Sequence, residues 1–475
     1  MLNKISHYAL ATFYNAFLGI FSIFILTKYY DFSDFGKIAL FILVGNAAGN
    51  LLTFGLGKAT QRFYFESLKN NNFTNFKVLN FSNLISILLI FIIFFPIIYI
   101  FAEDVKNFFK INEDINFFVI SYIYGFFNIT YFYFLNLIIS QKKSKTYLYF
   151  AVCYSTSNII LTILLIFFYN DTYLSRIYSL LVINIFFSIA IAYYNLSNLK
   201  FSWSNNEVVK SLKFSLPGYP STLMGIIHSN FDKTFLATVQ NITSLGILDI
   251  SNKIGLISKM FIDFIIQAWI PEFMTNANKN NRSKIVLNYK QIVFYFGIFI
   301  LGLSFFCEEL LWILTSESFY IAKYYIPLIC LSVFVNHMFT LVAAPAISYA
   351  KQLQKNFIPS LLSLFLNVSL NIMLIPIYGV LGVIISMVIS GLFSGCLSFY
   401  YGQKCFKLEI ELIFIFQKIL TLSFFISTVY LLYLVEFNMF LNLMIKIALF
   451  LVFIIATYKK EYFDIEYIKK IKFFE

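Results

Sequence analysis

The sequence predicts an all-α polytopic membrane protein, with about 14 transmembrane helices arranged as two six-helix bundles and a terminal helix pair. The composition is the first observation behind this class: 60% of the 475 residues are hydrophobic and 12% are charged, whereas soluble domains are near half apolar and a quarter charged. The second observation is a series of apolar segments along the chain, and the third is that the spacing of these segments repeats in the two halves. A nucleic-acid-binding protein would need a polar surface that this composition cannot supply, so we expect no nucleic acid partner.

The apolar segments are each about 20 residues long, which matches the hydrocarbon thickness of a bilayer. We expect transmembrane helices near residues 8–27, 38–57, 79–102, 117–140, 147–168, 177–197, 217–238, 245–268, 291–314, 325–348, 358–377, 380–401, 413–434 and 440–457. No connection leaves room for a soluble catalytic domain, so we expect the protein not to be an enzyme. The five cysteines have no metal-ligand spacing, and we expect no metal and no cofactor.

The distribution of basic residues predicts the orientation. With the N-terminus in the cytoplasm, 24 of the 35 Lys and Arg residues fall on the cytoplasmic side, 6 on the opposite side and 5 inside the predicted spans. Cytoplasmic connections carry such an excess in membrane proteins. We therefore expect both termini to be cytoplasmic.

A short motif indicates an internal repeat. Phe32-Ser-Asp-Phe-Gly36 follows the first predicted span, and Ile242-Thr-Ser-Leu-Gly246 follows the seventh, at an offset of 210 residues. The same offset superposes spans one to five on spans seven to eleven, although the sixth pair drifts. We expect bundles at residues 1–212 and 213–405, with two extra helices and a basic tail at 406–475. Because each repeat has an even number of spans, both halves enter the membrane in the same sense, as in some transporters.

The eighth predicted span carries charges where lipid should be. Its polar residues fall on one arc of a helix, opposite Ile250 and Ile254. Each charge at the bilayer centre costs about 2.5 to 3.5 kcal/mol, so this arc is expected to face protein or water. The arc consists of Asp249, Asn252, Lys253, Lys259, Asp263 and Gln267.

Two further spans contribute candidate cavity residues. His228 and Asp232 are one helical turn apart in the seventh span, with Lys233 beside them. Asn46 and Asn50 are one turn apart in the second span, among small residues that permit close helix approach. We expect all five side chains to line the same polar cavity.

Charge pairing is an alternative reading of the polar arc. Asp249 with Lys253, and Lys259 with Asp263, are separated by four residues and could neutralise each other without any transport role. Lys446 stands alone in the last span, where its amine could reach the membrane surface along its own stem.

Several motifs resemble those of bacterial polysaccharide flippases of the O-antigen (Wzx) type. The similarity covers essentially the whole chain, and the order of the motifs is more specific than any one of them. The motifs are Phe35-Gly36, Phe54-Gly-Leu56, Arg62, Lys213-Phe-Ser-Leu-Pro-Gly-Tyr-Pro220, Asp232-Lys233, Leu245-Gly-Ile-Leu-Asp249, Trp269-Ile-Pro271 and Asn371-Ile-Met-Leu-Ile-Pro-Ile-Tyr-Gly-Val-Leu-Gly382.

The resemblance implies the fold of the multidrug/oligosaccharidyl-lipid/polysaccharide exporter superfamily. It also implies alternating-access transfer of an undecaprenyl-pyrophosphate-linked oligosaccharide from the inner to the outer leaflet of the bacterial inner membrane, within lipopolysaccharide O-antigen biosynthesis. The partners would be this lipid-linked oligosaccharide, membrane lipids and other polysaccharide assembly proteins. This chain has Lys233 where many members have Arg, which replaces a bidentate fork by a point charge.

The expected roles follow from charge. Lys253 and Lys259, with Arg62 at the cytoplasmic mouth, would attract the pyrophosphate, while the acids balance charge or couple transport to H+ or Na+. The nearest alternative is a cation-coupled multidrug exporter of the same superfamily. A membrane polymerase or glycosyltransferase, and a non-transporting scaffold, are the alternatives from other classes.

Overall fold

The protein is built from helices in every part of the chain that the structure describes. The structure is a computed structural model that describes residues 2–70, 73–109, 113–169, 172–350, 352–434 and 439–457, and these ranges contain no strand. The chain forms two compact units, Met1–Asp249 and Ile250–Glu475. The predicted all-α polytopic class is confirmed. The predicted bundle boundaries are a different division of the chain and stay a prediction.

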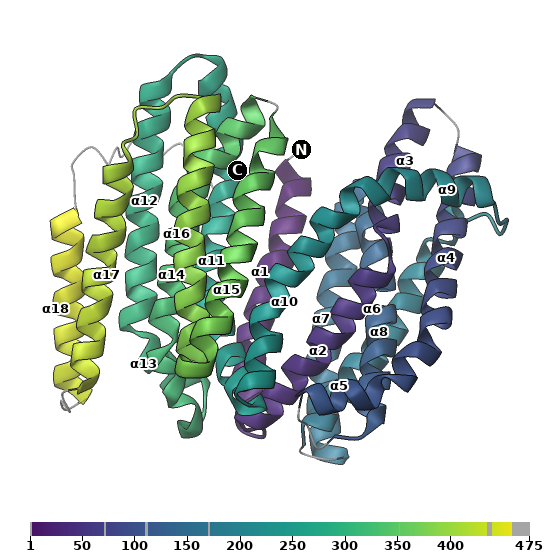
Figure 1. Ribbon diagram of the computed structural model, residues 1–475, viewed down its shortest axis with the longest axis horizontal. Helices are drawn as coiled ribbons and strands as arrows, with labels where there is room; N and C mark the ends of the chain where they lie inside the picture. Colours follow the sequence, from purple (N-terminus) through teal and green to yellow (C-terminus); the bar gives the residue numbers. More distant parts are fainter. Residues whose placement is uncertain are drawn as a thin grey trace. The chain divides into compact units, whose positions relative to one another are not determined.

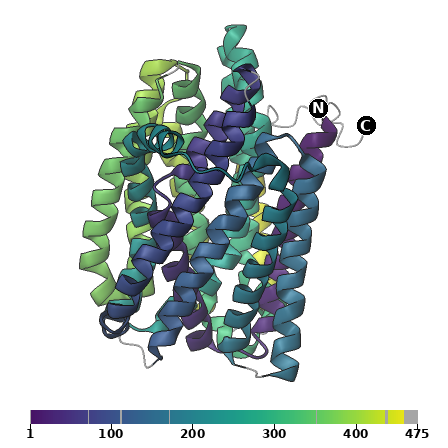
Figure 2. The same ribbon diagram turned by 90° about the vertical axis from the view of Figure 1, so that its right-hand side faces the viewer.

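The first unit contains long upright helices and shorter ones at their ends (Figure 1). Figure 2 shows its blue helices α4, α6, α7 and α8 running side by side. The helices of this unit are α1 (Leu2–Leu26), α2 (Phe32–Leu52), α3 (Leu56–Asn70), α4 (Phe73–Ile100), α5 (Ala102–Phe109), α6 (Ile115–Ser140), α7 (Ser144–Phe168), α8 (Tyr173–Tyr194), α9 (Asn205–Ser215), α10 (Tyr219–Val239) and the first turns of α11 (Ile242–Asn278).

The second unit contains the rest of α11 and the helices that follow it. In Figure 1, α17 and α18 lie side by side in this unit. The helices are α12 (Arg282–Phe305), α13 (Cys307–Leu314), the 3-10 helix η3 (Glu317–Tyr324), α14 (Ile326–Tyr349), η4 (Leu353–Asn356), α15 (Phe357–Tyr378), α16 (Val380–Cys405), α17 (Leu412–Leu434) and α18 (Met439–Thr457). The first unit also has two short 3-10 helices, η1 (Leu196–Asn198) and η2 (Leu216–Gly218).

Each of the fourteen predicted spans falls on one of these helices. Eleven of the described helices are long and apolar enough to cross a membrane, and α1, α10 and α18 carry the remaining three predicted spans. The chain is therefore a multi-pass membrane protein.

Two predicted span ends were wrong. The second helix ends at Leu52 rather than near residue 57, because Phe54 (φ 47°) and Gly55 (φ 74°) adopt left-handed backbone conformations that stop it. The ninth ends at Phe305 rather than near residue 314. There the chain starts the separate helix α13, which carries Glu308 and Glu309 in its first turn.

Glycines set the close packing of α2 against α6 in the first unit. A Cβ atom placed on Gly45 would lie 2.6 Å from the carbonyl oxygen of Ser121, and one placed on Gly125 would lie 2.1 Å from that of Gly45. Real side chains do not fit at these distances. The predicted close approach at the small residues of α2 is confirmed.

The two copies of the repeat motif contact each other. A Cβ atom on Gly36 would lie 2.0 Å from the carbonyl oxygen of Ile242, and one on Gly246 would lie 1.8 Å from that of Phe32. Each glycine thus faces the residue that begins the other copy, so the contact is symmetric. The regular offset extends beyond the motif, since α2 and α11 begin 210 residues apart, α4 and α12 209, and α6 and α14 211.

A methyl group at this crossing should separate the two helix starts. We expect Gly246→Ala and Gly36→Ala each to lower the free energy of unfolding by about 1 to 3 kcal/mol, the usual cost of overpacking. The measurement is thermal unfolding of the purified protein in detergent. Gly19→Ala is the matched control, because no atom lies within 4 Å of the Cβ it would add. Equal stability of Gly246→Ala and Gly19→Ala would contradict the close contact.

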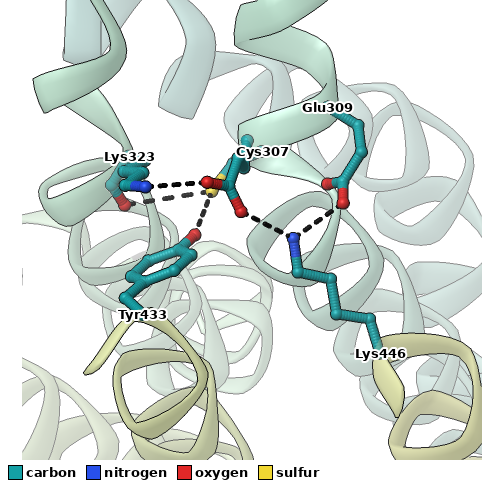
Figure 3. A network of polar contacts seen from close by, with 6 residues as sticks. Cys307, Glu309, Lys323, Tyr433 and Lys446 are labelled. Atoms are coloured by element: carbon teal, nitrogen blue, oxygen red, sulfur yellow. Dashed lines mark hydrogen bonds and ion pairs between the residues drawn. The ribbon is translucent and has the colours of Figure 1, made fainter. Parts of the chain in front are cut away.

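A buried ion-pair network in the second unit joins α18 to α13 (Figure 3). The amine of Lys446 is fully buried and lies 3.0 Å from Glu308 Oε2 and 2.7 Å from Glu309 Oε1. Lys323 in η3 lies 2.7 Å from Glu308 Oε1. The expectation that Lys446 stands alone and reaches the membrane surface was wrong, because its partners are more than 130 residues away in sequence.

Charge balance in this network favours the ionised form of the Glu308 carboxyl. Burial alone would raise the pKa of the Glu308 carboxyl, but its hydrogen bonds and ion pairs with Lys323 and Lys446 outweigh burial and hold this pKa below its usual value. A charge as deeply buried as that of Lys446 is tolerated only when it is paired. The network therefore fastens the terminal helix to the rest of the second unit.

Removing one charge of the ion-pair network should lower the stability of the protein. We expect Lys446→Met to destabilise the protein by about 3 to 5 kcal/mol, because it leaves Glu309 without its cation. The double variant Lys446→Met with Glu309→Gln should recover much of the loss, since Glu308 keeps Lys323. A double-mutant cycle on the thermal unfolding midpoint measures both effects. A Lys446→Met protein as stable as the parent would show that the network does not hold α18.

Candidate functional site

The polar arc of α11 lies on an exposed side of the helix in the second unit. Lys253, Lys259, Asp263 and Gln267 are all exposed, and Asn252 is half-buried. The opposite side is packed away from solvent, as the helical spacing of its residues predicts. Its fully buried members are Ile250, Ser251, Ile254, Ser258 and Ile262.

Close packing on α14 fixes the direction in which this arc points. A Cβ atom on Gly255 would lie 2.5 Å from the side chain of Ile329, so the two helices approach closely there. About four turns further on, the Trp269 indole N–H donates to the carbonyl oxygen of Leu341 at 2.8 Å. The buried side of α11 is thus held against α14, and this packing fixes the direction in which the charged side points.

The charges of the arc are only partly neutralised. Asp249 and Lys253 each have a polar or electrostatic partner, so the structure is compatible with charge pairing at these two residues. No ion pair within 4 Å joins Lys259 to Asp263 among the described residues; Asp263 Oδ1 instead lies 3.9 Å from His337 Nε2 of α14. At Lys259 and Asp263 the structure favours an accessible charged surface over pairing along the helix.

The side chain of His337 lies near Asp263 and is held in one tautomer. Its Nδ1 lies 2.7 Å from the carbonyl oxygen of Val333, and a carbonyl only accepts, so Nδ1 must carry the proton. In the neutral ring Nε2 then presents a lone pair toward the carboxylate, and protonation turns the contact into an ion pair. Lys259 is the other charged group acting on this ring. Sequence reasoning missed the pair because the two residues are 74 positions apart.

The candidates on α10 belong to the first unit. Asp232 is buried, with 5% of its surface exposed, and has a polar or electrostatic partner. Lys233 is half-buried and His228 is exposed. The predicted irregularity before this helix is present, since Leu216–Gly218 form the 3-10 helix η2.

The remaining candidates, Asn46, Asn50 and Arg62, also lie in the first unit, and their place in a cavity stays a prediction. The Asn46 side-chain oxygen accepts a hydrogen bond at 2.7 Å from the amide of Asn128 on α6, so it contributes to the α2–α6 contact. The amide of Asn50 donates to the backbone carbonyl of Asn46 at 2.9 Å, and Asn50 is exposed. Arg62 is exposed on α3.

Sequence reasoning assigned no site role to Arg176, which the structure places in the first turn of α8. Its Nη1 donates to Thr162 Oγ1 at 2.8 Å and to Asn158 Oδ1, both on α7. The sequence showed only a basic residue at the edge of a predicted span.

Among the described residues, no group of three or more His, Cys, Asp and Glu side chains could hold a metal ion.

Residues 1–277 match the family described as polysaccharide biosynthesis protein, which is more than half of the 475-residue chain. The chain belongs to this family. The resemblance to polysaccharide flippases found in the sequence is confirmed at this level. No curated protein sequence matches the chain.

Solved structures of transporters share the fold. The structure is similar to the lipid II flippase MurJ in an inward closed conformation, with a TM-score of 0.71 and 17% identity over 94% of this chain and 97% of that one. An inward-facing multidrug MATE transporter of the MOP superfamily has a TM-score of 0.63 and 15% identity over 82% and 93%. A mutant of the MATE transporter VcmN from Vibrio cholerae has a TM-score of 0.57 and 13% identity, over 85% of this chain and 98% of that one.

Proposed function

We propose that this protein is a flippase, and not an enzyme, that moves an undecaprenyl-pyrophosphate-linked oligosaccharide from the inner to the outer leaflet of the bacterial inner membrane. The observation that carries the proposal is the accessible charged side of α11, a membrane-spanning helix in a chain of the polysaccharide biosynthesis family. Both termini would lie in the cytoplasm, and the product would enter O-antigen assembly.

The energetics favour a water-filled passage beside α11. Lys253, Lys259 and Asp263 would each cost about 2.5 to 3.5 kcal/mol at the bilayer centre. Together these costs exceed what the apolar residues of one helix return, so the charged side must meet water rather than lipid. A sugar head group needs such a passage, because each of its unpaired polar groups would cost several kcal/mol in hydrocarbon. Its polyprenyl tail can remain in the lipid.

Each charged group has a role in this proposal. Lys253 and Lys259 attract the pyrophosphate as accessible point charges on one side of α11. The facing pair of Asp263 and His337 is the place where a proton could be taken up and released during the cycle. Coupling to H+ or Na+ otherwise stays a prediction.

A cation-coupled multidrug exporter is the second candidate. The observation that favours it is the accessible acid Asp263, which could bind a cationic drug in exchange for a proton. The two accessible lysines near it in the arc would repel such a substrate. A drug-susceptibility assay separates the two functions, since an exporter deletion sensitises cells to cationic drugs while a flippase deletion removes surface glycan.

Neutralising the two lysines should stop flipping without removing the protein. We expect Lys253→Gln with Lys259→Gln to abolish surface glycan and to accumulate lipid-linked oligosaccharide on the cytoplasmic leaflet, as deletion of the gene does. The measurements are glycan blotting, leaflet-resolved analysis of the lipid-linked oligosaccharide, and protein level in membranes.

Lys279→Gln is the matched control, because Lys279 is also exposed and follows the end of the same helix. It should leave surface glycan normal. Normal glycan in the double lysine variant would remove both lysines from the site. Normal glycan in the deletion strain would overturn the flippase function itself.

A further inference from the structure

The guanidinium of Arg176 lies in the first turn of α8 in the first unit. No ion pair within 4 Å is recorded for it in the described residues, and both of its hydrogen-bond partners, Thr162 and Asn158, are neutral. The arginine lies in α8, a helix long and apolar enough to cross a membrane. Ionisable residues within such helices are costly and mark functional pathways by default.

Glu113, an acid near this end of α8, is already engaged. Glu113 lies 2.9 Å from the amine of Lys37, and it accepts a hydrogen bond from the hydroxyl of Tyr173. Among the described residues, the groups that act electrostatically on Arg176 are the phenols of Tyr30, Tyr124 and Tyr154. In this part of the chain the guanidinium is therefore surrounded by neutral polar and aromatic side chains.

Part of the donor capacity of this site is unused. An arginine side chain carries five N–H donors, and only the two on Nη1 have recorded acceptors in the described part of the chain. The amide Nδ2 of Asn158 also has no hydrogen-bond partner there, although only 5% of that residue is exposed. Its orientation is not ambiguous, because the guanidinium can donate only to the amide oxygen and leaves the N–H2 group on the other side.

Neighbouring hydroxyls hold these donors in place. Thr162 Oγ1 lies 2.7 Å from the carbonyl oxygen of Asn158 and 2.9 Å from the hydroxyl of Ser179. The Ser179 hydroxyl donates to the same carbonyl at 2.8 Å. The α7–α8 contact thus fixes Arg176 and Asn158 before any ligand arrives, which lowers the entropy cost of binding.

We propose that Arg176, assisted by Asn158, binds an oxyanion of the transported head group. The planar fork of a guanidinium matches phosphate and carboxylate oxygens, and Arg176 remains partly accessible. The inference rests on the proposed function, which supplies two sources of such an oxyanion. One is the pyrophosphate of the carrier lipid, and the other is the carboxylate of an acidic sugar.

Ligand binding to the purified full-length protein tests this assignment. The probes are farnesyl diphosphate for the carrier pyrophosphate and glucuronate for an acidic sugar, titrated by calorimetry at low salt. We expect Arg176→Gln to weaken one of the two about ten- to a hundredfold, the range for a lost charge-assisted hydrogen bond. Arg176→Lys should fall between Gln and the parent, because it keeps the charge but loses the fork. Lys106→Gln, in the same unit, is the control and should bind as the parent does.

The outcomes separate this inference from the proposed function. A loss confined to farnesyl diphosphate assigns the pyrophosphate, and a loss confined to glucuronate assigns the sugar. Equal binding by Arg176→Gln and the parent, or no binding of either probe by the parent, overturns the inference, while the glycan assay of the α11 lysines decides the function independently. The thermal unfolding midpoint, measured without ligand, is the control for misfolding. If Arg176 had a purely structural role, Arg176→Gln would lower this midpoint and leave the ligand affinity of the folded protein unchanged.

Discussion

The high cost of an ionised group at membrane depth organises this protein. The chain meets that cost in two ways. Lys446 is sealed in the second unit against Glu308 and Glu309, so its charge is cancelled by direct pairing. Lys259 lies on the accessible side of α11 and has no ion-pair partner within 4 Å among the described residues. The first arrangement holds a helix in place, and the second requires water beside the helix.

Rigid packing makes the second arrangement possible. The contacts of Gly255 and Trp269 with α14 fix the buried side of α11, so its charges cannot rotate into neighbouring helices. In the first unit, hydroxyl hydrogen bonds between α7 and α8 hold Arg176 in the same way. A polar surface without bound partners must be held in place by its supports, and these tightly packed helices supply that support.

Local features of the structure could be predicted from the sequence. The helices, the polar arc of α11 and the small-residue contact of α2 follow from hydrophobicity and helical spacing within about 25 residues. The repeat motif around Gly36 and Gly246 was also readable, although only the structure shows that its two copies touch. The two wrong helix ends have different causes: the left-handed residues Phe54 and Gly55 stop α2, whereas Glu308 and Glu309 lie in an apolar segment after α12. Hydropathy averaged over a window detects neither.

Contacts distant in sequence could not be predicted. The residues near Lys446 in the sequence do not predict its contacts with Glu308 and Glu309, and those near Asp263 do not predict its contact with His337. Arg176 looked like an ordinary connection residue because its position in α8 depends on where the helix begins. Such pairings are set by how helices pack, and packing is specified by many weak contacts rather than by any local motif.

Thiol labelling measures whether water reaches the charged side of α11. Single cysteines in place of Lys259 and Asp263, in a parent without reactive native thiols, would be treated in intact membranes with a charged thiol reagent that does not cross lipid. A water-filled passage beside α11 predicts rapid labelling at both positions and none at Phe365→Cys, an apolar position on α15 that is 63% exposed. If the two α11 positions were as unreactive as position 365, the charged side of α11 would not face water.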